Sequence, residues 1–281
     1  MKWILFLSDL HVFSKFAIFP PNFKIPDYGE VPHGVNQKIL WKYWTDMLDR
    51  LKDLKLDYLI LVGDLVEGRN NARDQLCTEV ISPDPFIQGR AAVELLKPLA
   101  EKAQRKYVVR GNVYHDQVGG AAVEYIGEMI GAERFDDGTY STWWLILNPE
   151  NTDVIIDVCH FTSVPLVYRG TPLEREGFFE ALAANKFDLP DTHKPDLIVR
   201  GHVHYFEHIE HSTMHIITLP CWQLQTPYQI RKGRGRMIPD IGAVLVQVME
   251  KDEKEKRSPL EQDPIRVYKI LYKHPKIGVK R

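Results

Sequence analysis

Short polar motifs follow several apolar, strand-like runs of this chain. Together they contain seven residues whose side chains can bind a metal ion. In chain order these are Asp9, His11, Asp64, Asn112, His160, His202 and His204. Because side chains at the carboxyl ends of parallel strands converge at one edge of a sheet, the seven can share a ligand. Carboxylate, amide and imidazole donors suit borderline divalent ions such as Mn²⁺, Fe²⁺ or Zn²⁺. Seven donors satisfy two ions more easily than one, and ions about 3.5–4 Å apart can hold both the attacking and the leaving oxygen of a phosphoryl group.

Two of the motifs supply two donors each. In Asp9-x-His11 and His202-x-His204, an i, i+2 step along extended backbone returns both side chains to one side. Taken singly, an Asp or Asn after a strand is as readily a turn residue that bonds the local backbone. The convergence of all the motifs favours metal binding.

The order of the motifs resembles that of the calcineurin-like metallophosphoesterases. The chain has Asp-x-His, Gly-Asp, Gly-Asn with a following His-Asp, a lone His and Gly-His-x-His, spread over about residues 3–219. The resemblance implies an α/β fold, a four-layer α/β/β/α sandwich. It also implies two divalent ions, Mn²⁺ first and Fe²⁺/Fe³⁺ or Zn²⁺ as alternatives, with a hydroxide between them as the nucleophile.

The resemblance assigns each ligand a role. Asp9, His11 and His204 resemble ligands of the first ion. Asp64 resembles the bridging carboxylate. Asn112, His160 and His202 resemble ligands of the second ion.

One motif departs from the family pattern. Val113 and Tyr114 interrupt Gly-Asn-His-Asp, so the histidine and the aspartate stand at His115 and Asp116. In the family this histidine protonates the leaving oxygen and the carboxylate orients it, which is general acid catalysis. His115 is therefore the candidate acid, with phosphate binding or metal ligation as the alternative. The altered spacing bears most directly on Asn112 as a ligand.

Residues 228–236 form a basic, glycine-containing segment that is a candidate for phosphate binding. Its cations are Arg231, Lys232, Arg234 and Arg236. Arginine pairs bidentately with phosphate, and glycine lets the backbone approach closely. A solvated loop is the alternative.

Two further segments adjoin the motifs. Residues 161–172 leave directly from His160 and include Tyr168 and Arg169, which could line the same groove. Residues 12–34 carry five aromatic side chains and form either a lid whose rings stack on bases or a loop packed onto the domain.

Three histidines, His208, His211 and His215, continue the run after His204 along an expected hairpin. An extra metal site is one interpretation. Cross-strand or surface packing is favoured, because these positions do not fall at strand ends.

The elements that must position these residues follow from hydrophobic periodicity. Strands are expected at 3–8, 58–62, 106–110, 142–147, 154–158, 196–200, 207–209, 215–219, 243–249 and 266–272. Helices are expected at 39–51 and near 86–104, 120–131 and 172–186. The alternation in the first two-thirds indicates an α/β domain, and residues 205–281 are expected to complete a second sheet. We expect one domain, 1–281.

Composition restricts the setting of the protein. The 281 residues are 44% hydrophobic and 26% charged, which is typical of a globular chain. A net charge of −2 gives no overall attraction to nucleic acid or to anionic membranes. The apolar start ends at Ser8-Asp9 without a cleavage site, and no run approaches the ~18 residues of a membrane span, so a cytoplasmic location is expected. Three widely spaced cysteines are expected to be reduced thiols.

The resulting hypothesis is hydrolysis of a phosphodiester, with DNA or RNA the first class to test. General similarity to the nuclease branch of the family adds to this, although only 77 residues follow His204 (281 − 204), so a compact enzyme without a DNA-capping domain is expected. Alternatives are a phosphomonoesterase or protein phosphatase, a cyclic-nucleotide phosphodiesterase, and a catalytically silent interaction module. The filled ligand positions count against the last.

Overall fold

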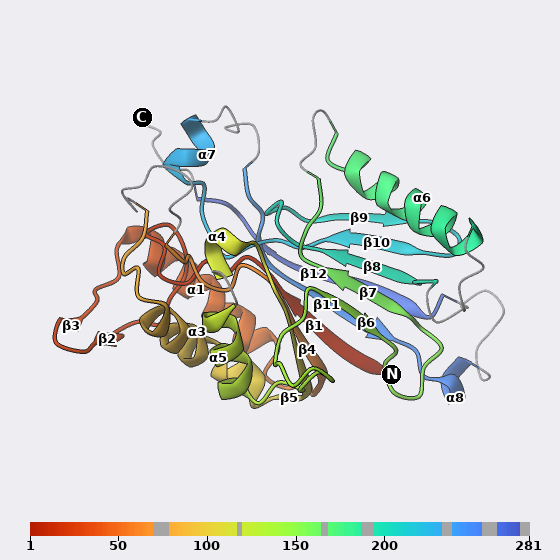
Figure 1. The fold of residues 1–281 in the computed structure, drawn as a ribbon, viewed down its shortest axis with the longest axis horizontal. Coiled ribbons are helices and arrows are strands. Elements are labelled where there is room, and N and C mark those ends of the chain that lie inside the picture. The colour runs from red at the N-terminus through yellow and green to blue at the C-terminus, as the bar shows by residue number, and fades with distance from the viewer. Residues whose placement is uncertain are drawn as a thin grey trace.

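The computed structural model describes residues 1–69, 79–116, 120–163, 168–186, 194–231, 238–254 and 263–275. Two five-stranded sheets form its centre, and a two-stranded hairpin of β2 (Lys24–Ile25) and β3 (Gly29–Glu30) lies to one side (Figure 1).

The first sheet has the strand order β12-β11-β1-β4-β5. Its strands are β1 (Lys2–Leu7), β4 (Leu56–Val62), β5 (Ala103–Val109), β11 (Ile241–Val248) and β12 (Ile265–Tyr272). β1, β4 and β5 run parallel, whereas β11 is antiparallel to both β1 and β12. The carboxyl ends of the three parallel strands therefore meet at one edge, directly before Asp9, Asp64 and Asn112.

The second sheet has the order β6-β7-β8-β10-β9. Its strands are β6 (Trp144–Leu147), β7 (Ile156–Cys159), β8 (Leu197–Arg200), β9 (Glu207–Glu210) and β10 (His215–Thr218). β7, β8 and β10 run parallel, and the outer strands β6 and β9 are antiparallel to their neighbours. His160 directly follows β7, and His202 lies two residues after β8.

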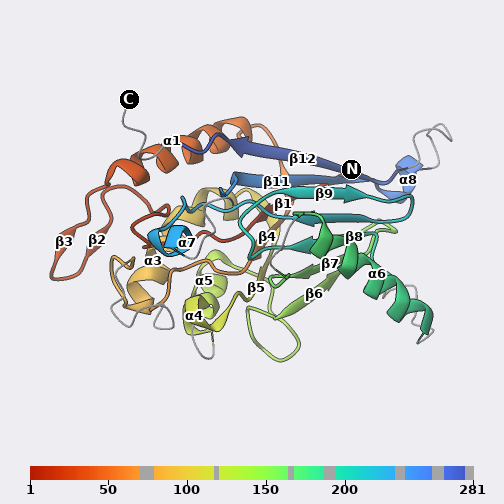
Figure 2. The same ribbon diagram turned by 90° about the horizontal axis from the view of Figure 1, so that it is seen from above.

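Helices cover the outer face of each sheet (Figures 1 and 2). α1 (Val35–Arg50), α3 (Pro85–Ala100) and α5 (Ala121–Ile130) pack on the first sheet, and α6 (Thr171–Lys186) packs on the second. Between the sheets, side chains such as Ile60 and Val109 meet Val158 and Val199 in one buried cluster. This confirms the four-layer α/β/β/α sandwich.

The expected strands and helices are all present, with ends shifted by a few residues. The helix expected near 86–104 ends at Ala100, because β5 begins at Ala103. Three short helices were not expected: α4 (Val113–Asp116), α7 (Pro227–Arg231) and α8 (Lys251–Lys254). A helix of one turn is too short to show the periodicity by which longer helices are recognised.

Three of the five aromatic rings of segment 12–34 pack into the core, and the base-stacking interpretation is wrong for these three, whereas Tyr28 on the β2–β3 hairpin is 87% exposed. Phe13, Phe19 and Phe23 are 0%, 1% and 3% exposed and join the core under α1. The ring centroids of Phe13 and Phe19 lie 5.3 Å apart, as do those of Phe13 and Phe23. Rings buried against one another cannot also stack on a ligand.

The cysteines and the search for membrane-spanning helices bear on two further expectations. Cys159 and Cys221 are free thiols, while Cys77 lies outside the described residues. In the described parts of the chain, no helix combines the length and apolar character needed to cross a membrane.

Candidate metal centre

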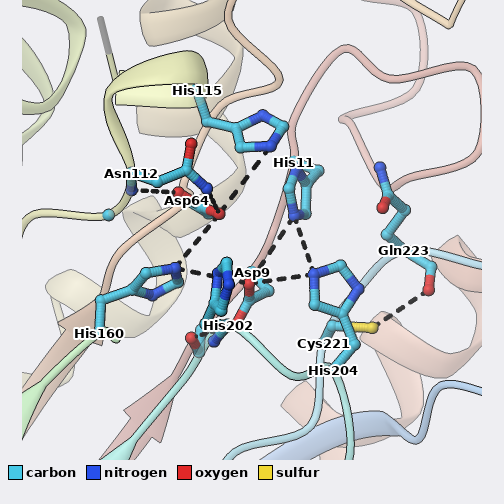
Figure 3. A network of polar contacts seen from close by, with 12 residues as sticks. Asp9, His11, Asp64, Asn112, His115, His160, His202, His204, Cys221 and Gln223 are labelled. Atoms are coloured by element: carbon cyan, nitrogen blue, oxygen red, sulfur yellow. Dashed lines mark hydrogen bonds and ion pairs between the residues drawn. The ribbon is translucent and has the colours of Figure 1, made fainter. Parts of the chain in front are cut away.

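The predicted ligands converge where the two sheets meet, at the carboxyl ends of their parallel strands (Figure 3). Five of them have left-handed backbone: Asp9 (φ 51°), His11 (46°), Asp64 (50°), His202 (70°) and His204 (60°). The extended geometry expected for the two double motifs is therefore wrong, and sharp turns aim these side chains instead. Left-handed backbone at a non-glycine residue costs on the order of 1–3 kcal/mol and concentrates at functional sites.

Asp9, His11 and His204 form the first ligand group. Asp9 Oδ1 lies 3.1 Å from His204 Nε2, and the Nε2 atoms of His11 and His204 are 3.2 Å apart. The three donor atoms lie within 4.8 Å of one another. Two imidazole nitrogens and a carboxylate that face each other at these distances suit a common cation.

Asp64, His160 and His202 form the second group. His160 Nδ1 donates to the Val62 carbonyl at 2.8 Å, which leaves Nε2 as a lone-pair donor 3.2 Å from Asp64 Oδ2. His160 Nε2 also lies 3.9 Å from Asp9 Oδ1, so the two groups adjoin. Two neighbouring groups of three donors match the two ions expected, and a third group of His11, Asp64 and His115 overlaps both.

Asn112 reaches the site, but its amide oxygen is engaged elsewhere. Its backbone N–H donates to Asp64 Oδ1 at 2.8 Å and its Nδ2 donates to Asp64 Oδ2 at 2.7 Å. Its Oδ1 accepts from the Tyr114 N–H at 3.0 Å, because the altered motif begins α4 immediately after Asn112. Ligation through Oδ1 requires the amide to turn, and this role stays a prediction.

The donor set fits divalent cations. Asp9 Oδ1 and His160 Nε2 are buried without a hydrogen-bond partner among the described residues. An unsatisfied buried polar atom costs roughly 1–3 kcal/mol, and a cation would satisfy both atoms. Burial lowers the pKa of His160, but the charges of Asp64 and Asp9 outweigh burial and raise it to about 10.

Three further candidate ligands have pKa values shifted by burial and by neighbouring charges. Burial also opposes the charge on His11, yet the carboxylates of Asp9 and Glu67 raise its pKa to about 10. Despite burial, the pKa of Asp9 lies well below its usual range because of His204 and His160. Burial and the charge of His160 lower the pKa of His202 to about 4, so its imidazole is neutral. Carboxylates that hold protons on these rings can hold divalent cations instead, in competition with protons.

Glycine precedes Asp64 and Asn112 because there is no room for a side chain. A Cβ on Gly63, whose φ is +70°, would lie 2.5 Å from the His160 ring. A Cβ on Gly111 would lie 2.1 Å from Asp64 Oδ1. The Gly-Asp and Gly-Asn motifs are thus a packing requirement of the ligands that they bring together.

His115 turns into the site in spite of the two-residue displacement (Figure 3). It is 1% exposed, and its Nδ1 donates to the Glu67 carbonyl at 2.8 Å. Its Nε2 lies 4.0 Å from Asp64 Oδ2. Asp116 accepts a hydrogen bond from the Gly111 N–H, and burial together with the charge of Asp64 raises its pKa to about 7. Asp116 thereby braces the turn that carries Asn112.

Two buried residues behind His11 were missed by the sequence reasoning. Glu67 Oε2 lies 3.0 Å from His11 Nδ1, and Gln223 Nε2 donates to the same oxygen at 3.2 Å. A carboxylate on the far nitrogen fixes the tautomer and the direction of a metal-binding imidazole. The spacing Asp64-x-x-Glu67 was a signal for Glu67, whereas nothing near Gln223 marked it.

Of the predicted substrate-binding cations, only Arg169 has a side chain that the structure describes. Arg169 donates to Asp240 Oδ2 at 3.2 Å and stacks 4.6 Å from the centroid of Tyr205, bracing the segment after His204. Arg231 ends α7, and its side chain is not described. Lys232, Arg234 and Arg236 lie outside the described residues. Phosphate contact by these four and by Arg169 stays a prediction.

Phe161 is the aromatic residue of segment 161–172 that adjoins the ligands. Its ring centroid is 5.4 Å from that of His160 and 5.5 Å from that of His202. Phe161 is 44% exposed, so one part of the ring packs on the ligands while another part faces solvent.

The four-layer sandwich carries two adjoining Asp/His groups at its strand ends. The family model of calcineurin-like phosphoesterases matches residues 2–206. The chain belongs to this family.

Similar solved structures show low identity. An archaeal phosphodiesterase has 10% identity and a TM-score of 0.42, covering 95% of this chain and 99% of its own. Wild-type Vps29 with Zn²⁺ from Entamoeba histolytica has 12% identity and a TM-score of 0.41, covering 96% and 99%. A predicted phosphoesterase from Streptococcus pneumoniae has 12% identity and a TM-score of 0.34, covering 95% and 97%. A search of curated proteins finds no match.

Proposed function

We propose that the protein hydrolyses phosphodiesters at a centre of two divalent transition-metal ions, with Mn²⁺ the first choice and Fe²⁺/Fe³⁺ or Zn²⁺ the alternatives. The observation that carries the proposal is the adjoining pair of ligand groups, Asp9 with His11 and His204, and Asp64 with His160 and His202. Two such ions, when bound, supply charge for the phosphoryl oxygens and activate water for attack. The core shared by both sheets supports treating 1–281 as one domain; the cytoplasmic location stays a prediction.

The residues of the chain supply the remaining chemistry. Asp64 would help to hold both ions, because its carboxylate lies 3.2 Å from His160 Nε2 of the second group and within 4.8 Å of a ring nitrogen of His11 from the first. Because Nδ1–H of His115 donates to the Glu67 carbonyl, Nε2 faces the site, and the doubly protonated ring would deliver its Nε2 proton to the leaving oxygen. His115 is thus the general acid, and Asp116 fixes the turn beside it.

The substrate class is a phosphodiester that bears a base, with DNA or RNA the first to test. The support is Phe161, an exposed aromatic ring in contact with two ligand imidazoles. A base stacked on an aromatic side chain gains about 1–3 kcal/mol in single-stranded nucleic acid complexes.

The test is a substrate panel run with Mn²⁺ and with chelator. It contains bis-p-nitrophenyl phosphate, p-nitrophenyl phosphate, single- and double-stranded DNA, RNA, cyclic nucleotides and a phosphopeptide. We expect chelator-sensitive cleavage of bis-p-nitrophenyl phosphate and of at least one nucleic acid. Faster turnover of p-nitrophenyl phosphate than of the diester would replace the diesterase with a phosphomonoesterase.

A matched pair of variants tests the base-stacking surface. Phe161→Leu keeps an apolar side chain but removes the ring, and it should raise KM for nucleic acid while leaving bis-p-nitrophenyl phosphate unaffected. Tyr168→Leu, which is 75% exposed in the same segment, serves as the control. Equal kinetics of wild type and Phe161→Leu on nucleic acid would remove Phe161 from substrate binding.

A further inference from the structure

The β9–β10 hairpin carries a second group of ligand-type side chains, away from the metal centre. His215 begins β10 and pairs with Leu197, the first residue of β8. His202 instead follows the last residue of β8, Arg200. The hairpin group and the metal centre therefore lie toward opposite ends of the second sheet.

His208, Glu210 and His215 project from one face of this hairpin. Glu210 is paired directly with His215 across the strands, and His208 precedes Glu210 by two residues. Directly paired residues and i, i+2 residues lie on the same face of a sheet. One nitrogen or oxygen of each side chain lies within 4.8 Å of the others.

The two imidazoles are arranged to face each other. His208 Nε2 lies 3.0 Å from His215 Nδ1, and the rings stack with centroids 5.3 Å apart and planes 18° apart. His215 is only 6% exposed, so its orientation is fixed by packing.

Asp263 settles which nitrogen of His215 carries the proton. Its carboxylate oxygens lie 3.1 and 3.2 Å from His215 Nε2 and accept that proton, which leaves a lone pair on Nδ1. A carboxylate on the far nitrogen is the usual partner of a metal-binding histidine. Asp263 lies two residues before β12, an edge strand of the first sheet, so this contact also joins that edge to β10 of the second sheet.

A hydrogen bond from His208 Nε2 to His215 Nδ1 would satisfy both ring nitrogens. It would leave the Glu210 carboxylate without a role. Within the described residues, no hydrogen bond or ion pair engages the Glu210 carboxylate, although it faces both rings. A pocket of about 530 Å³, lined by Glu210, His215 and Asp263 among others, gives access from solvent. A cation would use all three donors at once.

We propose that His208 Nε2, Glu210 and His215 Nδ1 bind one divalent transition-metal ion of the Zn²⁺ type, with Asp263 as the residue that positions His215. Two imidazoles and a carboxylate are a donor set that Zn²⁺ accepts, and three protein ligands leave a fourth position open to the pocket. Because the ion binds the folded hairpin and not the unfolded chain, it stabilises the contact between the sheet edges.

The test counts bound Zn²⁺ in the full chain by elemental analysis after gel filtration and by titration calorimetry. Glu210→Gln keeps both imidazoles and the hairpin but removes the charged donor. We expect it to bind one equivalent fewer than wild type, or to bind that equivalent at least ~10-fold more weakly. Asp263→Asn should keep the stoichiometry and weaken the same equivalent ~10–100-fold.

His211→Ala is the matched control, because His211 lies in the turn of the same hairpin, lines the same pocket and faces Glu174 at 3.4 Å. It should bind as wild type does. Melting curves in chelator check that each variant is folded. Equal Zn²⁺ binding by wild type and both Glu210→Gln and His208→Gln would overturn the site, and so would loss of the same equivalent in His211→Ala. The readout is a difference between variants, so it is independent of phosphoesterase activity.

Discussion

The two sheets contribute different chemistry to one metal centre. The first sheet supplies both buried carboxylates, Asp9 and Asp64, which are 0% and 1% exposed. The second sheet supplies imidazoles only, from His160, His202 and His204. The negative charge of the candidate centre therefore comes from the first sheet, and the second sheet adds imidazole nitrogens.

This division has an electrostatic consequence. Two divalent ions held by two carboxylates and neutral imidazoles keep a net charge of about +2, which is available for an anionic substrate. A centre built from four carboxylates would bind its ions more tightly, but its net charge of about zero would not attract a phosphoester. Replacing a carboxylate of the first sheet should therefore lower activity more than replacing an imidazole of the second sheet.

The largest effect is expected from Asp64→Asn on the first sheet. Loss of the carboxylate between both ligand groups should lower kcat/KM on bis-p-nitrophenyl phosphate by more than ~10³-fold, since loss of a single transition-state donor already costs ~10²–10³. His160→Gln on the second sheet is the matched variant and should cost less at saturating Mn²⁺. Equal losses in both variants, measured with metal content, would break the comparison.

The next effect concerns stability. Behind the imidazoles, Arg200 of β8 is 6% exposed and forms ion pairs with Asp157 of β7 and Glu176 of α6. Arg200→Met leaves Asp157 buried and unpaired, which should lower the free energy of unfolding by about 3–5 kcal/mol in urea titrations. Adding Asp157→Leu should recover much of the loss.

A surface ion pair provides the control for this prediction. Lys97 lies 3.8 Å from Glu101 and is 69% exposed, so Lys97→Met should change stability by less than about 0.5 kcal/mol. A similarly small change in Arg200→Met would show that the buried pairs do not hold the second sheet together.

His115 belongs to neither sheet, and its variant separates acid catalysis from metal binding. His115→Ala should slow diesters with poor leaving groups by about 10²-fold or more and p-nitrophenyl esters far less, because only a poor leaving group needs a proton. Tyr114→Ala, 56% exposed on the same short helix, is the control. A uniform loss on all esters, together with lost metal, would make His115 a ligand.

The smallest effect is expected at Glu67. Glu67→Gln keeps a polar group near His11 but removes the charge that orients its Nδ1, 3.0 Å away. Metal affinity measured by calorimetry should fall by ~10–100-fold. Glu94→Gln, exposed on α3, should bind like wild type.

The fold, and the meeting of the candidate ligands at the strand ends, could be predicted from the sequence for a local reason. Each candidate ligand follows an apolar strand, with β1 and β8 each followed by two of them, so Asp64 after β4 or His160 after β7 can be recognised within ten residues. The left-handed turns were missed because Asp9 and His11 adopt a conformation that their residue types only tolerate.

Other features depend on contacts between distant segments. The pairing of Arg169 with Asp240 and that of His215 with Asp263 join segments that only the folded chain brings together. The burial of Phe13 and Phe19 depends on α1, and the engagement of the Asn112 amide depends on a one-turn helix without periodicity. None of these could be inferred from neighbouring residues.

The left-handed backbone of the candidate ligands lowers the stability of the fold. Glycine at Asp9, His11 or His202 would relax the backbone there, and each relaxation is worth on the order of 1–3 kcal/mol. The same changes would abolish metal binding. The five left-handed positions therefore lower the stability of the sandwich so that their side chains can point into the candidate site.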